Sequence, residues 1–341
     1  LAREIPALDL EDPAEPGAER LIELARGVEG AAMAVKGVTN SEGGGASFSR
    51  SAVALATSTG FFGRHAGTSH SIGVAVLAGE GTGMERDYAQ SNARHASDME
   101  TPDVVGKRAG ERTIKRLNPL QAKSQRAPVV YDPRVSASLV GSFAGAISGA
   151  SIARGVSFLK DKMGQAVFGP SINIIDDPHR VRGLRSKPFD GEGVANRKMA
   201  LIENGVLTAW LLDTASARQL GLTTNGHAAR GTGGPPSPST TNLYMAPGKL
   251  SPEELMADIK DGFYVTETMG FGVNGVTGDY SQGAAGFWIE NGKIAYPVSG
   301  VTIASNLKEM FLNLTPANDL EFRHGTNAPT IRVEGMTIAG S

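Results

Sequence analysis

The 44 glycines of this 341-residue chain constrain its fold more than any other feature. Glycine is favoured in turns and wherever two backbone segments approach closely. Aromatic residues make up only 6% of the sequence, which leaves little side-chain volume for thick helical layers. The composition therefore predicts a globular protein rich in turns, and its length allows two domains of ordinary size.

The chain contains no cysteine, and its formal net charge is −2. Disulfides, cysteine-ligated zinc and thiol nucleophiles are therefore excluded within it, and a reducing, cytoplasmic compartment fits. The near-neutral charge gives no indication of nucleic-acid binding. No apolar run reaches the roughly 18–20 residues of a membrane-spanning helix. Because the first residue is Leu1 and not methionine, we expect the chain to be part of a longer protein.

Residues 1–122 predict a small helix–sheet–helix domain. Apolar residues recur at helical spacing over residues 18–35. Alternating and β-branched stretches over residues 46–57 and 71–79 then predict a small antiparallel sheet. A second helix is expected over residues 103–117.

Residues 127–341 predict a larger, mainly antiparallel β domain with a few helices, so the fold class is α+β. The segment APVVYDP predicts a strand, and a helix of unusually small residues is expected over residues 134–152. Further strands are expected at 171–175, 198–202, 208–213, 262–269, 286–289, 293–297 and 330–334, with helices at 252–260 and 303–314. Short turns between the strands indicate a large antiparallel sheet or an open barrel.

The six histidines form no pattern typical of a metal site. Only His65 and His70 lie within five positions of each other, and a spacing of five does not place two ligands on one face of a helix. Surface or hydrogen-bonded histidines explain them better. One alternative stays open, which is a metal site assembled from dispersed residues such as His70, Glu85, Asp87 and His227.

Three other motifs are weak. Residues 270–275 match G-x-G-x-x-G, but a loop follows where a dinucleotide site needs a helix. Residues 157–160 match S-x-x-K, but the partner motifs of penicillin-recognising enzymes are missing. A basic stretch is interrupted by Glu111 and indicates a solvated helix face more than a DNA site. Its members are Lys107, Arg108, Arg112, Lys115 and Arg116.

Polar glycine-rich loops are more informative. They cover residues 79–87, 189–193, 230–234 and 270–280. Loops of this kind can present backbone N–H and C=O groups to an extended peptide. Each is also typical of a hairpin turn that needs a positive φ angle, so both interpretations stay open.

Three long blocks resemble the PmbA/TldD family and occur in the family's order. They are FDGEGVANRKMALIENGVLTAWLLDTASARQLG, TNGHAARGTGGPPSPSTTNLYM and GFGVNGVTGDYSQGAAGFWIENGKIAYPVSGVTIASNL. The similarity continues upstream through GEGTGMERDY and GKRAGERTIKRLNP, so it covers essentially the whole chain. The third block is more similar to the PmbA (TldE) branch than to the TldD branch. Family members have a further N-terminal region that would precede Leu1.

The resemblance implies a cytoplasmic heterodimer of TldD and PmbA (TldE) that degrades or trims peptides and has also been labelled a modulator of DNA gyrase. TldD-type members carry an H-E-x-x-x-H zinc motif on a helix that corresponds here to residues 135–152. That segment, VSASLVGSFAGAISGASI, contains neither His nor Glu. The cysteine-containing segment of TldD-type members is also missing near the C-terminus. The resemblance therefore implies the subunit without metal ligands, with zinc in a TldD-type partner.

From the resemblance and the glycine-rich loops we expect a peptide-contacting role for Arg230, Gly231, Asn274, Asp279 and Tyr280. They would contact an extended or unfolded peptide or shape the substrate chamber. We assign no catalytic residue and no metal ligand to this chain, and we expect neither membrane nor direct nucleic-acid binding. The alternatives are a hydrolase that is active alone and a homodimeric peptide-binding module.

Overall fold

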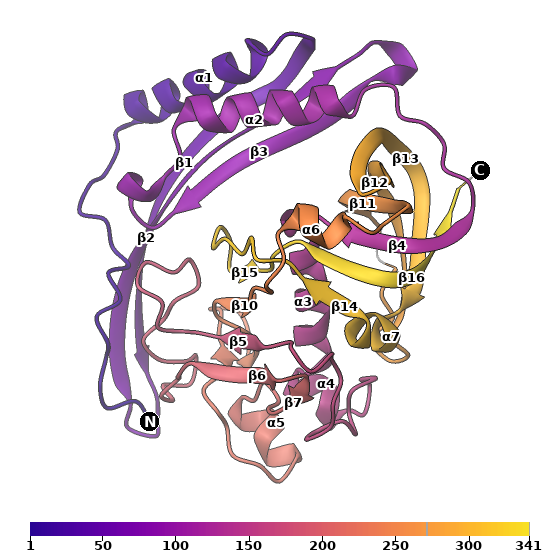
Figure 1. Ribbon diagram of the computed structural model, residues 1–341. Helices are drawn as coiled ribbons and strands as arrows, with labels where there is room; N and C mark the ends of the chain where they lie inside the picture. Colours follow the sequence, from indigo (N-terminus) through magenta and orange to yellow (C-terminus); the bar gives the residue numbers. More distant parts are fainter. Residues whose placement is uncertain (271, 341) are drawn as a thin grey trace.

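The computed structural model describes residues 1–270 and 272–340 of the chain (Figure 1). Phe271, within the expected loop at 270–280, and Ser341, at the end of the expected second domain, lie outside the described residues. The predicted α+β class is confirmed. Two helices and a three-stranded sheet lie above a strand-rich body in Figure 1. No helix in the described ranges is long and apolar enough to cross a membrane.

The upper sheet is antiparallel and has the order β1-β2-β3. Its strands are β1 (Val38–Ala56), β2 (Phe62–Ala78) and β3 (Glu85–Ala93). Strand β1 begins before the expected stretch at 46–57 and has a register shift between Ser41 and Gly44. The last three residues of the expected loop at 79–87 are instead the start of β3. That strand was not predicted because its buried positions include the polar residues Asp87 and Ser91.

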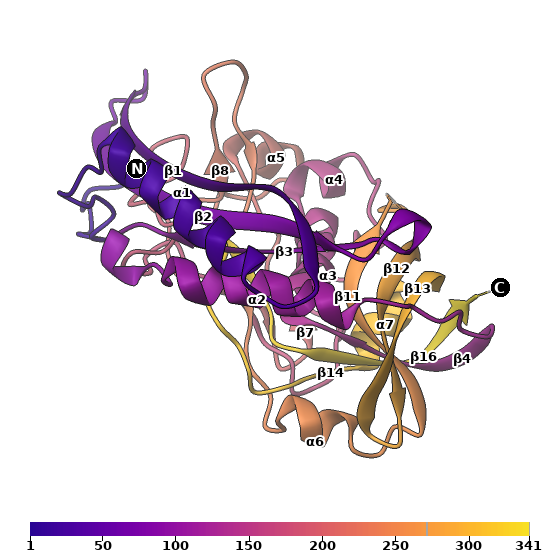
Figure 2. The same cartoon turned by 90° about the horizontal axis from the view of Figure 1, so that it is seen from above.

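Helices α1 (Ala18–Met33) and α2 (Pro102–Lys115) lie side by side on one face of this sheet (Figure 2). The Thr101 hydroxyl oxygen accepts a hydrogen bond from Val104 N and caps α2. Gly106 allows the two helices to approach closely, because a Cβ atom there would lie 2.3 Å from the carbonyl oxygen of Val28. Short 3-10 turns lie at Gly81–Gly83 and Ala96–Asp98.

The lower body is built around a barrel that closes on itself. Its strands are β4 (Gln125–Tyr131), β11 (Asp261–Met269), β12 (Asp279–Glu290), β13 (Lys293–Asn306) and β16 (Ile331–Ala339), with β14 (Leu314–Pro316) added on β16. Closure occurs because β13 pairs with both β12 and β16. The β4–β11 pair is parallel and the others are antiparallel. Gly286 permits tight packing, since a Cβ atom there would lie 1.9 Å from Tyr264 O.

A second sheet packs below the barrel, and short helices fill the connections (Figure 1). Its strands, in spatial order, are β15 (Thr326–Asn327), β10 (Leu243–Met245), β5 (Ile174–Asp176), β6 (Met199–Glu203) and β7 (Val206–Leu207). The remaining elements are α5 (Thr214–Gln219), α6 (Pro252–Met256), α7 (Leu307–Leu312) and the pair β8 (Ala228–Ala229) and β9 (Ser237–Pro238). The expected helix at 303–314 begins later, because β13 continues to Asn306. The expected strand at 208–213 is wrong except for one bridge at Leu211.

The expected helix at 134–152 is interrupted. Its parts are α3 (Pro133–Ala146) and α4 (Gly149–Ala153). Between them the backbone bonds to another segment: Leu211 N donates to Ile147 O, and Gly149 N donates to Leu211 O at 2.8 Å. A side chain at Gly149 would meet Leu211 O at 2.7 Å. Small residues therefore allow close packing here, and that packing ends the helix.

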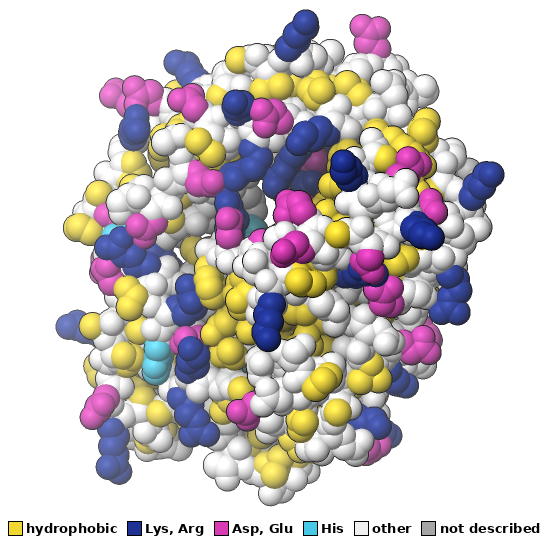
Figure 3. All heavy atoms as spheres, in the orientation of Figure 1, with side chains coloured by type: hydrophobic (Ala, Val, Ile, Leu, Met, Phe, Trp, Pro, Cys, Tyr) yellow, Lys and Arg dark blue, Asp and Glu magenta, His cyan; other side chains and the backbone are white. Residues whose placement is uncertain are grey.

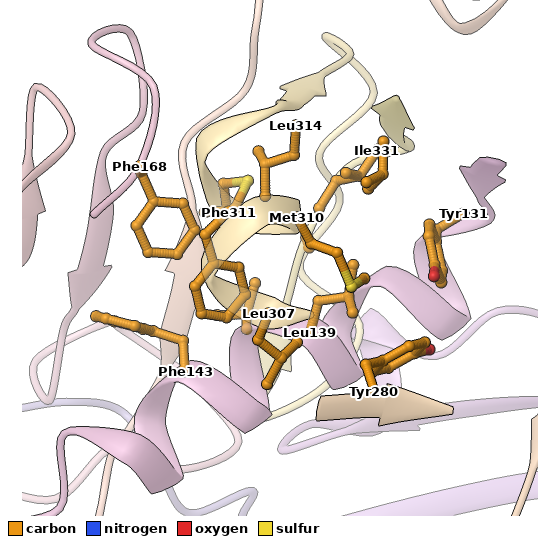
Figure 4. Packing of buried hydrophobic residues seen from close by; sticks show 14 of the residues in the cluster. Tyr131, Leu139, Phe143, Phe168, Tyr280, Leu307, Met310, Phe311, Leu314 and Ile331 are labelled. Atoms are coloured by element: carbon orange, nitrogen blue, oxygen red, sulfur yellow. The ribbon is translucent and has the colours of Figure 1, made fainter. Parts of the chain in front are cut away.

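Helix α3 forms the centre of the main hydrophobic core, together with α7 and the barrel (Figure 4). Phe143 of α3 meets Phe311 of α7 edge to face, with ring centroids 6.2 Å apart. Phe168 stacks on Phe311 at 4.4 Å. These aromatic contacts fix the orientation of α3 and thereby the position of its N-terminal turn.

Candidate functional site

A cleft lies between the three-stranded sheet with its helix α2 and the barrel. It consists of two adjoining cavities of about 490 and 190 Å³ that share Asp87, Arg134 and Thr266. In Figure 3, Lys and Arg side chains gather around a hollow on this face, below the position of α2 in Figure 1. We call the larger cavity, which Arg112, Lys115 and Arg134 line, the basic cleft.

Asp87 is the acidic centre of an ion-pair network beside the cleft. Its side chain is 2% exposed, and Arg134 donates to its two carboxylate oxygens at 2.7 and 3.2 Å. Burial alone would raise the pKa of Asp87, but the hydrogen bond and charge of Arg134 outweigh it and lower that pKa. Arg116 lies 3.7 Å from the same carboxylate and pairs with Glu85 and Glu267. The network therefore ties β3 to α2, α3 and β11.

Arg112 and Lys115 line the same cleft without a carboxylate partner. Among residues 1–270 and 272–340, no carboxylate oxygen lies within 4.0 Å of either side chain. Within the described part of the chain, the Arg112 side chain donates one hydrogen bond, at 3.3 Å to Tyr88 O. Burial and the nearby charge of Arg134 lower its pKa, as expected for a cation short of counter-charge. Two cations thus line one cavity without a direct ion pair to any described carboxylate.

The predicted solvated helix face over residues 107–116 is therefore wrong for most of its members. Lys107 is exposed, at 70%, and fits that interpretation. Arg108 instead pairs with Glu100, and Arg116 is 12% exposed within the Asp87 network. The prediction is wrong because one side of α2 faces the sheet edge and the barrel. Carboxylates from distant parts of the chain lie there and pair with the arginines of the helix.

Helix α3 enters this region with its first turns. Asp132 caps it, because its carboxylate accepts bonds from Arg134 N and from the Tyr264 hydroxyl, both at 3.1 Å. Val135 and Ser138 line the smaller cavity. Farther along the helix, Gly141 and Gly145 are exposed, and a Cβ atom at either would meet nothing within 4 Å. The exposed side of α3 thus carries hydroxyl groups and glycines.

Three of the five expected peptide-contacting residues lie near the start of β12: Asn274 in the preceding turn, and Asp279 and Tyr280 as the first residues of the strand. Asn274 N donates to Asp279 O at 2.9 Å, and the Asn274 side chain accepts a hydrogen bond from Val276 N. Hydrogen bonds from Thr277 and Asn306 lower the pKa of Asp279. Tyr280 is only 3% exposed inside the barrel core, and burial raises its pKa to about 12. The polar groups of this turn mostly stabilise the turn itself.

The other two expected residues lie in the β8–β9 connection. Arg230 is exposed, and its Nε donates to Gly191 O at 3.1 Å. Gly231 is also exposed. None of the five expected residues lines either cavity of the cleft. Sequence reasoning missed Arg134 and Tyr264 entirely, and it noticed Arg112 and Lys115 only as part of the basic stretch.

The residues of the alternative, dispersed metal site have separate partners. His70 Nε2 lies 3.0 Å from a carboxylate oxygen of Asp12, and His227 Nε2 lies 3.3 Å from one of Asp176. The carboxylates at positions 85 and 87 belong to the arginine network of the cleft. Over the part of the chain that the structure describes, no group of three or more His, Asp or Glu side chains could hold a metal ion.

Comparison with known proteins decides the family. The family model "PmbA/TldA metallopeptidase central domain" matches residues 11–117, and "PmbA/TldA metallopeptidase C-terminal domain" matches residues 124–340. The chain belongs to the PmbA/TldD family. The resemblance inferred from the three sequence blocks is therefore confirmed. Together the two matches place both the three-stranded sheet and the barrel within the family.

Curated relatives agree with this assignment. "Metalloprotease PmbA" of Escherichia coli O157:H7 is 42% identical over 342 residues, which span 100% of this chain and 74% of the relative. "Metalloprotease PmbA homolog" of Haemophilus influenzae is 34% identical and has the same coverage of both chains. The similarity to PmbA extends over every element described above.

Solved structures share the fold. A proposed modulator of a DNA gyrase from Thermotoga maritima matches 99% of this chain and 78% of its own, with a TM-score of 0.90 and 26% identity. A proposed modulator of DNA gyrase from Bacteroides thetaiotaomicron gives 0.88 and 27%, over 98% of this chain and 75% of its own. TldE from Thermococcus kodakarensis, at 23% identity, gives a TM-score of 0.85 over 100% of this chain and 80% of its own, and so shares the fold.

Proposed function

We propose that this chain is the subunit without metal ligands in a two-chain, TldD/TldE-type peptidase that degrades or trims peptides in the cytoplasm. The observation that carries the proposal is the composition of α3. Its first turns border the cleft, yet the side chains it offers there, Val135 and Ser138, are not zinc ligands. A zinc peptidase needs about three protein ligands and one water on the metal. We therefore assign the zinc to a TldD-type partner.

The role we assign to this chain is to hold the peptide. Strand β3 pairs only with β2 in the described sheet, so no strand covers its other edge. At Tyr88 the backbone N–H and C=O of β3 bond to the side chains of Asp87 and Arg112, and a peptide would displace these contacts. Residues 86–88 of β3 line the cleft, and residues 90–92 line a further cavity of about 250 Å³. An extended peptide can add to such an edge through main-chain hydrogen bonds. This geometry supports a chamber wall that binds peptides with little regard to sequence.

Complex formation and zinc content test the proposal. We expect this chain, mixed with the TldD-type protein of the same organism, to form a mixed complex of larger mass by light scattering. We expect elemental analysis to find stoichiometric zinc in that complex and in the partner alone, and none in this chain. A stable homodimer that forms no complex with the partner would contradict the proposal and favour the homodimeric peptide-binding module.

One observation favours a second candidate function. The curated relatives that span this whole chain are themselves named metalloproteases. A peptidase that is active alone would have to complete its metal site from residues such as His70, Glu85, Asp87 and His227. Stoichiometric zinc in the purified chain, together with peptide cleavage in the absence of any partner, would establish this candidate and overturn the first one.

A further inference from the structure

The side chains that line the basic cleft carry one more positive charge than negative charge. Arg112, Lys115 and Arg134 line it, against the carboxylates of Asp87 and Asp132. Both carboxylates have partners: Asp87 binds Arg134 in a two-pronged contact, and Asp132 accepts bonds from the α3 N-terminus and from Tyr264. Counted over these lining side chains, one positive charge is in excess, and it lies in a walled cavity where electrostatic attraction is stronger than on an open surface.

The opposite wall of the basic cleft is apolar. It is formed by Tyr264 and Phe287, and by Ile294 and Pro297 near the β12–β13 turn. Ile294 is 48% exposed, although its chemistry favours burial. A volume of about 490 Å³ lies within the usual range of small-molecule sites and can hold one or two amino-acid residues. The cavity therefore offers a cationic side and an apolar side to the same ligand.

We propose that the basic cleft binds the C-terminal carboxylate of a peptide whose last side chain is apolar. Arg112 and Lys115 receive the carboxylate, and the wall formed by Tyr264, Phe287 and Ile294 receives the side chain. One carboxylate matches the single excess positive charge of the lining side chains, whereas the charge of a dianionic phosphate exceeds it. This inference rests on the proposed function, because it names which end of the peptide the chamber wall recognises.

Direct binding tests the inference without zinc, partner or catalysis, so its failure is distinct from a failure of the proposed function. The probe is a hexapeptide of five alanines and a C-terminal leucine, with fluorescein on its N-terminus. Its affinity for the full chain is measured by fluorescence anisotropy. We expect the free carboxylate to bind about tenfold or more tightly than the C-terminal amide, since hydrogen bonds to charged groups are the strong ones. Added salt should weaken the binding of the carboxylate peptide but not the binding of the amide peptide.

Two variants and one matched control locate the site. K115Q removes an exposed cation and R112Q removes a half-buried one, and each should weaken binding of the carboxylate peptide about tenfold. K107Q removes one charge from the same helix at a 70% exposed position outside the cleft, and should leave binding unchanged. Thermal unfolding shows whether each variant is folded. Because Lys115 is exposed, K115Q is expected to stay folded and tests the site even where R112Q is destabilised.

Several outcomes would overturn the inference. The inference is wrong if the carboxylate and amide peptides bind equally, if K115Q binds the carboxylate peptide as the wild-type protein does, or if neither peptide binds. Each result would show that the cleft does not recognise a peptide C-terminus. Competition experiments add one more outcome. Inorganic phosphate that displaces the peptide at lower concentration than N-acetyl-leucine would assign the cleft to a free anion instead.

Discussion

Replacement of Asp87 by alanine is expected to lower the free energy of unfolding by about 3–5 kcal/mol. The carboxylate is 2% exposed and is the two-pronged partner of Arg134, whose own side chain is 15% exposed. Without it the buried guanidinium group keeps only the weaker contact with Asp132, whose oxygen lies 3.6 Å from Nε, and loses its hydrogen-bonded counter-charge. Urea unfolding followed by circular dichroism measures the difference.

The control for this prediction is Glu42→Ala, which removes the partner of Arg86. That pair is also an arginine–carboxylate contact, at 2.8 Å, but its side chains are 46–48% exposed. Such surface pairs contribute about 0–1 kcal/mol. A loss of the same size in both variants would show that burial of the Asp87 network does not stabilise the fold.

The Asp87 effect should also depend on pH. Its pKa is lowered in the folded protein, so the unfolded chain binds the proton more tightly. The stabilisation is therefore fully present above the unfolded pKa of about 3.9 and is lost as pH falls through the lower folded value. We expect the gap in unfolding free energy between the wild-type protein and Asp87→Ala to narrow below about pH 4. A gap that widens on acidification would contradict the assigned shift.

Phe311→Ala is expected to cost about 3–5 kcal/mol of stability, the usual loss for a buried phenylalanine. Phe311 is 1% exposed and packs against the rings of Phe143 and Phe168 in the main core (Figure 4). Its removal leaves a cavity where α3 and α7 meet. Because α3 also borders the cleft, we expect Asp87 and Arg134 to lose some of their fixed geometry as well.

Phe62→Ala provides the matched control, because Phe62 is 71% exposed at the start of β2. Exposed substitutions of this kind usually change stability by about 0.5 kcal/mol or less. Chemical denaturation of both variants under the same conditions gives the comparison. Similar losses at positions 62 and 311 would contradict the assignment of the aromatic cluster as the main core.

Elements with strong local signals could be predicted from the sequence. The helix over residues 102–115 has a threonine cap and a proline in its first turn, and both features act within a few residues. The helix over residues 134–152 was predicted too long, because its end depends on backbone bonds to Leu211, which lies about 60 positions away. Local spacing carries no information about such a contact.

The site was harder to predict for the same reason. Arg116 pairs with Glu267 at a separation of 151 positions, so no short motif contains both residues. The basic stretch of α2 can be recognised in the sequence. Which of its side chains face the cleft depends on how the helix packs against the sheet edge and the barrel. Tyr280 was expected to contact a peptide because of the family resemblance and because it ends the polar glycine-rich loop at 270–280. Alternation along β12 turns it into the core instead.

Peptidase activity of the reconstituted complex tests the central claim most directly. The TldD-type partner would be assayed on an unfolded peptide substrate alone, with this chain, and with this chain carrying Ser138→Ala as a check that α3 supplies no catalytic group. We predict full activity only when both chains are present, and no loss from Ser138→Ala. Full activity of the partner without this chain would contradict the account.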